Sequence, residues 1–479
     1  MIQSIIHTSE KGNLYLYNDN QRLSLLIHPE FKKAHESSMN VDPYYSGKYE
    51  YLKKYGFFSE FDHANIETFI DDSMVKESIM QVPQILFEVT DCCNLKCTYC
   101  AQGELYEDSE NRNSKNINIH YAIDLLKYVF NLAPQKKKDK LYIAFYGGEP
   151  LLNIKFIKQI VEVAHQLNAK NDMTINYVMT TNAILIHKYI DFLVDNKFSI
   201  MISLDGNEKN HSYRVFCKDK KNSFQKVIKN IDFIKKKYPA FFESNILFNA
   251  VIHNRNSVKE IYEFIYNRYK KNPRISELNI VDFNPIKNNI IQKMFHSKRK
   301  SETEYQNEEN NLLIHNELLA YRELSDFLKH LSVNYYISNV NDFFHNDEKY
   351  LPASTCLPFS KKIFLTTCNN LLPCEKISYK YSLGKVNQNI EIDISRITRQ
   401  YNLYYEHLKK QCQCCYTYRF CGLCMFHIKN LYKLESEEFV CDWFHDQITF
   451  QSKLHRVFSF LEKYPDDFFE IIEHTINIS

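Results

Sequence analysis

Short apolar runs alternate with amphipathic segments through the middle of this chain. The runs have the length and the β-branched and aromatic content of buried strands, and they cover residues 84–90, 141–147, 175–181, 198–204, 245–253 and 277–283. Segments with apolar residues at helical spacing lie between them, including 122–133 and 153–167. This alternation of six strands with helices predicts an α/β fold, either a parallel sheet or a partial (β/α)6 barrel. Catalytic groups are then expected at the carboxyl ends of the strands.

The first 80 residues have a different pattern. Residues 13–27 contain two alternating apolar runs around a polar turn at 18–20, which predicts a β-hairpin. A short helix over about 45–55 should end at Gly56, because glycine is a natural helix C-cap. Residues 1–80 are therefore predicted to form a small α+β unit ahead of the core.

The core is expected to cover residues 81–285, and the pattern beyond it is less regular. Residues 286–350 are rich in charged residues, Asn and helix formers, which predicts a linker with one or two helices. Residues 351–446 combine short strands, many turns and most of the cysteines. A helix at about 447–463 is expected to close the chain, within a final segment 447–479.

Composition excludes several classes of protein. Among the 479 residues, Lys and Arg number 60 and Asp and Glu number 58, so the formal charge of +2 gives no field for nucleic acid or an anionic membrane. No apolar stretch approaches the ~20 residues needed to span a bilayer. The N-terminus lacks a basic segment followed by an apolar core, which favours a cytoplasmic protein.

The cysteines are the most informative residues. In a chain without a secretory signal, 14 cysteines favour metal ligands or redox groups over disulfides. One group lies within residues 92–100 and a larger one within 356–441, with Cys217 alone between them. Two metal-binding regions are therefore predicted.

The first group has the spacing C-x3-C-x2-C through Cys93, Cys97 and Cys100. Three thiolates on one compact loop can hold three irons of a [4Fe–4S] cluster and leave the fourth iron open. A zinc site is the competing interpretation, but zinc commonly takes paired C-x2-4-C motifs and four ligands. Cys92 is expected not to be a ligand.

With Tyr99 at its aromatic position, this loop resembles the signature of the radical S-adenosylmethionine (SAM) superfamily. Residues 146–150 resemble the family's GGEP motif, which binds the methionine amino group, and residues 210–214 resemble its H-D-x-x-R stretch. The resemblance implies a TIM-like barrel, a cluster-bound SAM and a 5′-deoxyadenosyl radical that abstracts hydrogen. The residues that it assigns to cofactor binding are Tyr99, Gly147, Gly148, Glu149, Pro150, Asn182, Ser203, Asp205 and Arg214.

The downstream cysteines resemble the SPASM extension of radical SAM enzymes that modify peptides. Cys356, Asn369 and Cys374 fit its first part, with Asn in place of Gly at a turn. Asn is tolerable there because it also enters the left-handed region. The Cys421–Cys424 spacing is one residue shorter than in the family.

The wiring of that extension implies two auxiliary [4Fe–4S] clusters. The ligands of one would be Cys412, Cys415, Cys421 and Cys441. The other would be held by Cys356, Cys374 and Cys424, with Cys368 or a substrate thiolate as its fourth ligand. A zinc-ribbon-like module is the alternative, and Cys414 and Cys217 are surplus.

Glu375 directly follows Cys374. In sulfatase-maturating relatives an Asp at this position acts as a base beside the substrate, so the resemblance makes Glu375 a catalytic candidate. A solvated glutamate in a turn is the alternative.

These resemblances imply a radical SAM peptide maturase that installs a thioether or carbon–carbon cross-link in a ribosomally made precursor. The N-terminal unit would capture the leader as an added strand, at an edge formed by Leu14–Tyr17 or Leu23–Ile27. A flavodoxin- or ferredoxin-type protein would supply electrons, and neither nucleic acid nor membrane is an expected partner. The alternatives are a sulfatase-maturating enzyme that forms formylglycine and a non-catalytic zinc-binding scaffold.

Overall fold

A computed structural model of the protein describes residues 4–58, 64–106, 114–132, 139–169, 173–279, 283–306, 319–332, 335, 349–431, 441–466 and 468–469. The chain forms two compact units. The first comprises Met1–Phe69, Glu309–Thr355 and Tyr401–Ser479. The second comprises Ile70–Glu308 and Cys356–Gln400.

The second unit is built on one sheet with the strand order β11-β10-β8-β7-β6-β4-β12-β13-β14-β15. Every pair from β11 to β12 is parallel, and the remaining pairs are antiparallel. The strands are β4 (Gln84–Thr90), β6 (Lys140–Gly147), β7 (Thr174–Thr181), β8 (Ser199–Ser203), β10 (Ile246–Val251), β11 (Arg274–Ser276), β12 (Ile363–Leu365), β13 (Asn370–Leu372), β14 (Gly384–Val386) and β15 (Ile390–Ile392). The predicted α/β class with a parallel sheet is confirmed.

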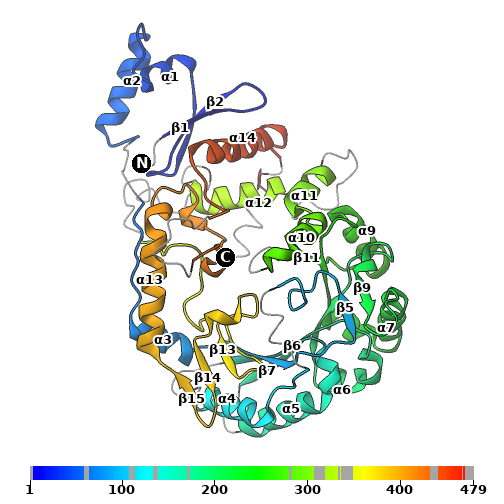
Figure 1. The fold of residues 1–479 in the computed structure, drawn as a ribbon. Helices are drawn as coiled ribbons and strands as arrows, with labels where there is room; N and C mark the ends of the chain where they lie inside the picture. Colours follow the sequence, from blue (N-terminus) through cyan, green and yellow to red (C-terminus); the bar gives the residue numbers. More distant parts are fainter. Residues whose placement is uncertain are drawn as a thin grey trace. The chain divides into compact units, whose positions relative to one another are not determined.

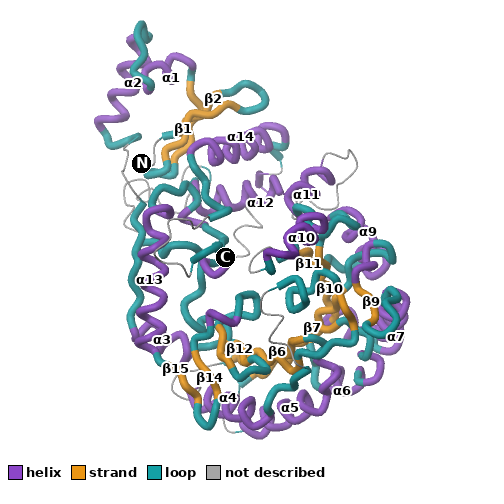
Figure 2. Tube along the Cα trace, viewed as in Figure 1, coloured by secondary structure: helices purple, strands orange, loops and turns teal. Residues whose placement is uncertain are grey.

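Helices cover the outer face of the parallel strands (Figures 1 and 2). They are α4 (Ile119–Leu132), α5 (Ile154–Asn168), α6 (Ile190–Asp195), α7 (Phe224–Lys237) and α9 (Val258–Tyr269). The helices expected at 122–133 and 153–167 correspond to α4 and α5, whose buried apolar residues recur at helical spacing. The remaining helices of this unit are α3 (Asp72–Met80), α8 (Pro239–Asn245), α10 (Asn288–Met294) and α11 (Lys298–Gln306), and α13 (Ile394–Cys412) begins in it.

The last predicted strand lies in a different place. The structure has β11 at Arg274–Ser276, whereas the strand was expected at 277–283, of which 280–282 lie outside the described residues. Leu278 is buried, but in a cluster with aromatic residues that include Tyr99 and Tyr106. Its apolar character therefore reflects packing over the strand ends, and the local pattern could not distinguish this from a place in the sheet.

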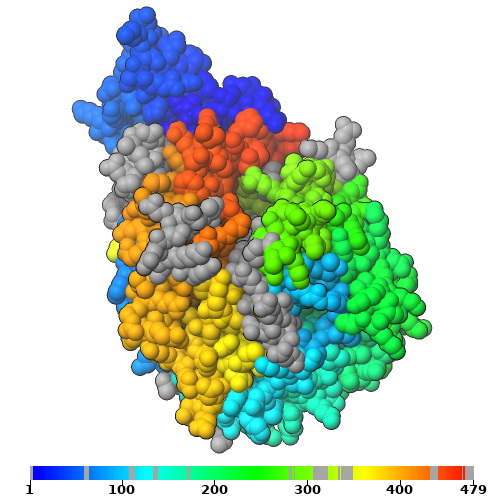
Figure 3. All heavy atoms as spheres, in the orientation of Figure 1, coloured from blue at the N-terminus to red at the C-terminus, as the bar shows by residue number. Residues whose placement is uncertain are grey.

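The cysteine-rich part of the chain contributes to the same sheet. Strand β12 pairs with β4 through Ile363↔Ile85 and Leu365↔Phe87, and these four residues are buried. Figure 3 shows the yellow segment of the second unit against its cyan residues. The segment 356–400 is thus an extension of the core sheet, whereas the predicted boundaries group it with 351–446.

The first unit contains a three-stranded antiparallel sheet of order β1-β2-β3, with β1 (Ile5–Thr8), β2 (Leu14–Asn18) and β3 (Leu23–Ile27). The predicted hairpin is therefore present, and β1 was not predicted. Either β2 or β3 was expected to offer a free edge. Among the described strands β2 lies in the centre of this sheet and β3 lies at its edge. Its helices include α1 (Pro29–His35), α2 (Pro43–Lys54), α12 (Leu319–Asp326) and α14 (Gln447–Lys463).

Helix α14 has the bounds expected for the closing helix, and α2 begins two residues earlier than expected and ends before Gly56. Helix α13 was not predicted, because its region was interpreted as short strands and turns. No helix in the described part of the chain is long and apolar enough to cross a membrane.

Candidate functional site

The cysteine loop follows β4 at the carboxyl edge of the parallel sheet, where the sequence placed it. Within the loop, β5 (Leu95–Cys97) pairs antiparallel with β9 (Arg214–Phe216), and Cys97 lies opposite Arg214. The backbone N–H of Thr98 donates to the carbonyl of Tyr213 at 3.2 Å. This small ladder fixes the middle cysteine of the motif against a segment more than a hundred residues away in the chain.

The end of β6 approaches the cysteine loop so closely that it requires glycine. The N–H of Gly148 donates to the Thr90 carbonyl at 2.8 Å, and the N–H of Glu149 donates to the Cys92 carbonyl at 2.8 Å. A Cβ on Gly148 would lie 2.0 Å from the Cys92 carbonyl oxygen. A Cβ on Gly147, whose φ is +124°, would lie 2.3 Å from the Thr90 carbonyl oxygen. The two glycines therefore allow the backbone at the end of β6 to pack directly against the backbone of the cysteine loop.

A cavity of about 870 Å³ opens above these strand ends. That size lies within the range of small-molecule sites, which is roughly 300–1,000 Å³. Its wall brings together the cysteine loop, the ends of β6, β7 and β8, and three lysines. The predicted site residues that line it are Cys93, Cys97, Cys100, Gly147, Gly148, Asn182, Ser203 and Arg214.

The loop thiols are suited to binding a metal cluster. Burial raises the pKa of the Cys97 thiol to about 12, although the Arg214 guanidinium beside it acts in the opposite direction. Burial raises the pKa of Cys93 still further. A buried thiolate needs a positive partner, and iron provides one. Three thiolates around a cavity can hold three irons of a [4Fe–4S] cluster and leave the fourth iron open.

Glu149 is fully buried and lies behind the cavity wall. Its carboxylate accepts hydrogen bonds from the Thr181 hydroxyl at 2.7 Å and from the Asn182 N–H at 2.8 Å. Burial raises the pKa of Glu149 to about 7, and these hydrogen bonds oppose the rise. The side-chain nitrogen of Asn182, Nδ2, lies 3.7 Å from the Cys93 sulfur. Glu149 therefore positions the end of β7 beside the first cysteine.

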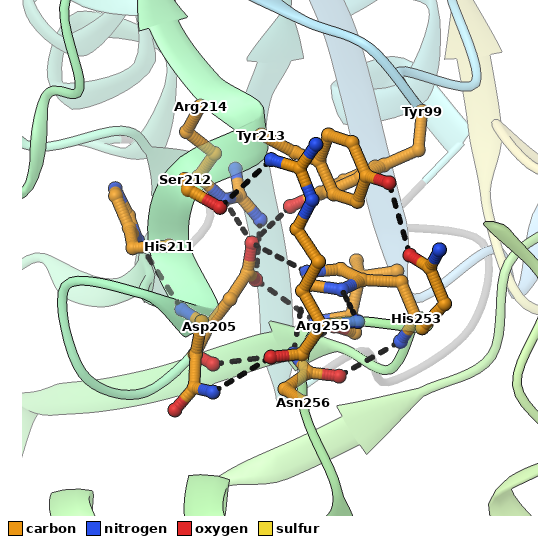
Figure 4. A network of polar contacts seen from close by, with 12 residues as sticks. Tyr99, Asp205, His211, Ser212, Tyr213, Arg214, His253, Arg255 and Asn256 are labelled. Carbon is orange, nitrogen blue, oxygen red and sulfur yellow. Dashed lines mark hydrogen bonds and ion pairs between the residues drawn. The ribbon is translucent and has the colours of Figure 1, made fainter.

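Asp205, just after β8, is the centre of a buried polar network (Figure 4). Its carboxylate accepts from Arg214 Nε at 2.8 Å and Nη2 at 3.0 Å, from the Val251 N–H at 3.0 Å, and from the Tyr99 hydroxyl. Burial acts to raise the pKa of Asp205, but the Arg214 guanidinium holds it at about 2. A bidentate pair of this kind fixes both partners. Asp205 thus ties the cysteine loop to the ends of β8 and β10.

The structure divides the predicted cofactor residues into two groups. The residues that line the cavity are Gly147, Gly148, Asn182, Ser203 and Arg214. The residues that lie behind its wall are Tyr99, Glu149, Pro150 and Asp205. The sequence gives His253 no ligand spacing and places it among core or surface histidines. In the structure it is buried two residues after β10, and its ring centroid lies 5.5 Å from that of Tyr99 and 4.9 Å from that of Tyr213.

Four cysteines of the first unit line a second, mostly apolar cavity. They are Cys412, Cys415, Cys421 and Cys441. Burial, together with a smaller effect of the nearby Cys415 and Cys421 thiols, raises the pKa of Cys412 to about 12 and that of Cys441 to about 11. Such a set of thiols suits one auxiliary cluster, and it is the set that the sequence resemblance assigned to one cluster.

The other predicted auxiliary set is distributed over both units. Cys356, Cys368 and Cys374 belong to the second unit and Cys424 to the first. Cys368 lies in the turn between β12 and β13, at the same sheet edge as the cysteine loop. Asn369 in that turn has φ +64°, so the left-handed conformation expected for it is confirmed.

Glu375 is paired within this region. Its carboxylate lies 2.9 Å from the Lys362 ammonium and 3.6 Å from the Cys374 sulfur. Burial acts to raise the pKa of Glu375, but Lys362 more than offsets this and lowers it. Its role as a base remains a prediction, and the solvated-turn alternative does not describe this half-buried ion pair.

Replacing Cys412 or Cys441 with alanine should remove one auxiliary cluster, or about four irons per chain. Loss of the cluster should also destabilise the first unit, because metal binding is linked to folding. Iron analysis and thermal unfolding of the anaerobically reconstituted protein measure both effects. Cys414→Ala is the matched control and should keep full iron; full iron in both test variants would contradict the assignment.

Comparison with known proteins agrees with this geometry. Residues 87–265 match the Radical SAM superfamily, a range that includes the cysteine loop, the glycine pair and Arg214. The assignment made from the cysteine loop and the GGEP motif is therefore confirmed for this region.

Two curated relatives each match a part of the chain. One is a cysteine-type anaerobic sulfatase-maturating enzyme of Clostridium novyi, 31% identical over 37% of this chain and 45% of its own length. The other is the radical SAM cyclopropyl synthase TigE of Paramaledivibacter caminithermalis, 26% identical over 43% of this chain and 42% of its own length. The chain thus spans less than half the length of these relatives.

A solved structure resembles a larger part of the chain. The structure of native anSMEcpe with bound AdoMet covers 83% of this chain and 100% of its own, with a TM-score of 0.53 and 18% identity. At this identity the likeness concerns the fold.

Proposed function

Residues 87–265 form a domain of the radical SAM superfamily, and from this premise we propose that the protein is an enzyme that modifies a peptide substrate. The observation that carries the proposal is the shared cavity of Cys93, Cys97, Cys100 and Arg214. The finer proposal is that the enzyme installs a thioether or carbon–carbon cross-link in a ribosomally made precursor.

When bound, a reduced [4Fe–4S] cluster and S-adenosylmethionine supply a 5′-deoxyadenosyl radical that removes hydrogen from an unactivated C–H bond. Cys93, Cys97 and Cys100 would hold three irons of that cluster. Arg214 places a fixed cation at the cavity wall, where the N–H groups that do not bind Asp205 can face a carboxylate.

A peptide substrate is supported by the relatives and by the first unit. The relatives include a sulfatase-maturating enzyme, and the structure of native anSMEcpe with bound AdoMet and Cp18Cys peptide is similar to 82% of this chain with a TM-score of 0.50. Edge strand β3 offers a row of backbone groups to an added strand, which is the mode by which sheets capture extended peptides. We propose that a leader peptide binds there.

Formylglycine formation is the second candidate, because sulfatase-maturating enzymes are among the relatives. The radical SAM domain itself argues against a non-catalytic zinc scaffold. A flavodoxin- or ferredoxin-type protein remains the proposed electron donor.

The test incubates anaerobically reconstituted full-length protein with S-adenosylmethionine and dithionite, and with one of two peptides. The first is the product of any short Cys-rich or repeat-bearing reading frame found beside the gene, and the second is a sulfatase peptide with the target cysteine. Loss of two hydrogens from the precursor without an aldehyde supports the cross-link, and a hydrazine-reactive aldehyde in the sulfatase peptide supports formylglycine. Absence of 5′-deoxyadenosine with both peptides would refute the radical mechanism.

Leader binding predicts a specific effect at β3. Leu26 is 64% exposed on this strand, so Leu26→Glu should leave the fold intact but place a charge where leader side chains would pack. Precursor affinity should fall about tenfold, which corresponds to ~1.4 kcal/mol. Fluorescence anisotropy measures the affinity. Met39→Glu, at a 93% exposed position outside the sheet, is the control, and equal affinities for both variants would place recognition elsewhere.

A further inference from the structure

A buried ion pair joins two distant segments of the first unit. Asp19 lies in the turn between β2 and β3, and Arg419 lies in a short 3-10 helix, Tyr418–Phe420. The Arg419 Nη1 atom is 3.1 Å from an Asp19 carboxylate oxygen, and the two side chains are only 2% and 1% exposed. The residues are 400 positions apart in the chain.

The surroundings of the pair are largely aromatic. The Tyr17 hydroxyl donates to Asp19 at 3.1 Å, and Nη1 of Arg419 also donates to the Tyr418 hydroxyl. The Arg419 guanidinium lies 4.6 Å from the centre of the Tyr418 ring. Tyr17 belongs to the same buried cluster as Tyr418 and Phe450. Within the described part of the chain, Arg419 Nε and Nη2 have no hydrogen-bond partner.

Such a pair is a poor source of stability. Removing two charges from water costs several kcal/mol per ion, and apolar replacements of similar volume are often neutral or stabilising. Two buried guanidinium donors without partners add to that cost. The pair is therefore better explained by what it positions, because a buried ionic contact fixes one register of the segments that it joins.

Arg419 lies between two cysteines that face one cavity. Cys415 and Cys421 flank its helix, and both line the cavity with Cys412 and Cys441. Tyr418 lines the same cavity and holds the guanidinium. A shift of Arg419 would therefore move the segment that carries two of the four thiols.

The N-terminal sheet also packs on the closing helix of this unit. Rings of Tyr17 and Phe450 lie 5.5 Å apart, and those of Tyr15 and Phe458 lie 4.4 Å apart. Figure 3 shows the blue N-terminal residues against the red-orange segment that contains α14. The N-terminal sheet, which would bind a leader, thus shares one hydrophobic core with the cysteine segment.

We propose that Asp19 and Arg419 are positioning residues of the centre formed by Cys412, Cys415, Cys421 and Cys441, so that the N-terminal sheet is part of the structure that assembles this centre. The inference rests on the proposed role of these four thiols as ligands of an auxiliary cluster. It gives the N-terminal sheet a second task besides peptide capture.

The test is made in a background without the three loop cysteines, so that any iron bound to the protein is held by the auxiliary cysteines. In a Cys93→Ala/Cys97→Ala/Cys100→Ala background, Asp19→Asn and Arg419→Met are compared for iron per chain and for the rate of iron loss to a chelator. Residues that orient metal ligands typically contribute 10–100-fold to metal affinity, so iron loss should be about tenfold faster in both. Asp42→Asn is the control, because Asp42 is exposed in the same N-terminal region and Asn preserves its helix cap.

A double variant separates positioning from folding. Asp19→Leu/Arg419→Met keeps an apolar core, so its iron-free form should unfold near the temperature of the iron-free background, yet the reconstituted variant should lose iron faster. Iron content and loss rates equal to the background in all three test variants would overturn the positioning role. A background protein that binds no auxiliary iron would overturn the cluster assignment itself, and the proposal with it.

Discussion

Alanine at Cys93, Cys97 or Cys100 is expected to abolish the reductive cleavage of S-adenosylmethionine. Each thiol lines the cavity above the parallel strands, and a cluster that leaves one iron open needs three protein thiolates. Loss of any one should leave the cluster labile, so the rate should fall to that of the protein-free reaction. Production of 5′-deoxyadenosine under dithionite, measured by chromatography, is the readout.

The neighbouring thiol provides the control for this prediction. Cys92 precedes the motif, and its carbonyl is held by the Glu149 N–H, but its side chain does not line the cavity. Cys92→Ala should cleave S-adenosylmethionine at nearly the wild-type rate. Iron analysis should show that the three loop variants keep their auxiliary iron. Wild-type 5′-deoxyadenosine formation by any of them would contradict the ligand assignment.

Gly148→Ala is expected to reduce S-adenosylmethionine cleavage by about 100-fold or more, although it alters no metal ligand. The new Cβ would lie 2.0 Å from the Cys92 carbonyl oxygen, so β6 and the cysteine loop would have to separate. A displacement of about 1 Å in an active site can cost about 100-fold in rate. Iron content and 5′-deoxyadenosine formation measure the effect.

Gly47→Ala is the matched control for that substitution. Gly47 lies within α2, and a Cβ there would meet no atom within 4 Å. Since glycine inside a helix costs roughly 0.5–1 kcal/mol relative to alanine, this variant should be slightly more stable and fully active. Equal activity of the Gly148 and Gly47 variants would show that the loop tolerates the separation.

The local pattern of apolar residues predicted much of the second unit, because each buried strand needs apolar residues within its own sequence. Strand β4 has the bounds expected for it, and β6 and β7 differ by one residue. The error at 277–283 has a different origin, since Leu278 is buried by packing over the strand ends. Apolar content indicates burial, but it does not say against which partner.

The cysteine motif and its spacing were visible in the sequence, but the division of labour among the polar residues was not. Asp205 remains a predicted cofactor residue, and the structure adds that its carboxylate accepts hydrogen bonds from Arg214, Tyr99 and the Val251 N–H. These partners come from separate elements of the fold. Only their convergence shows which residue faces the cavity and which supports the wall.

The amino-acid sequence by itself determined the features that depend on near neighbours: the core strands, the closing helix, the cysteine spacing and the glycine pair. The tertiary structure decided the features that depend on distant partners. Asp19 belongs to a polar turn in the sequence but is the buried partner of Arg419 in the structure. In the same way, β12 joins β4 across more than 250 residues. A local pattern records the burial of a residue or its tendency to turn, whereas the identity of its partner is set only when the chain closes on itself.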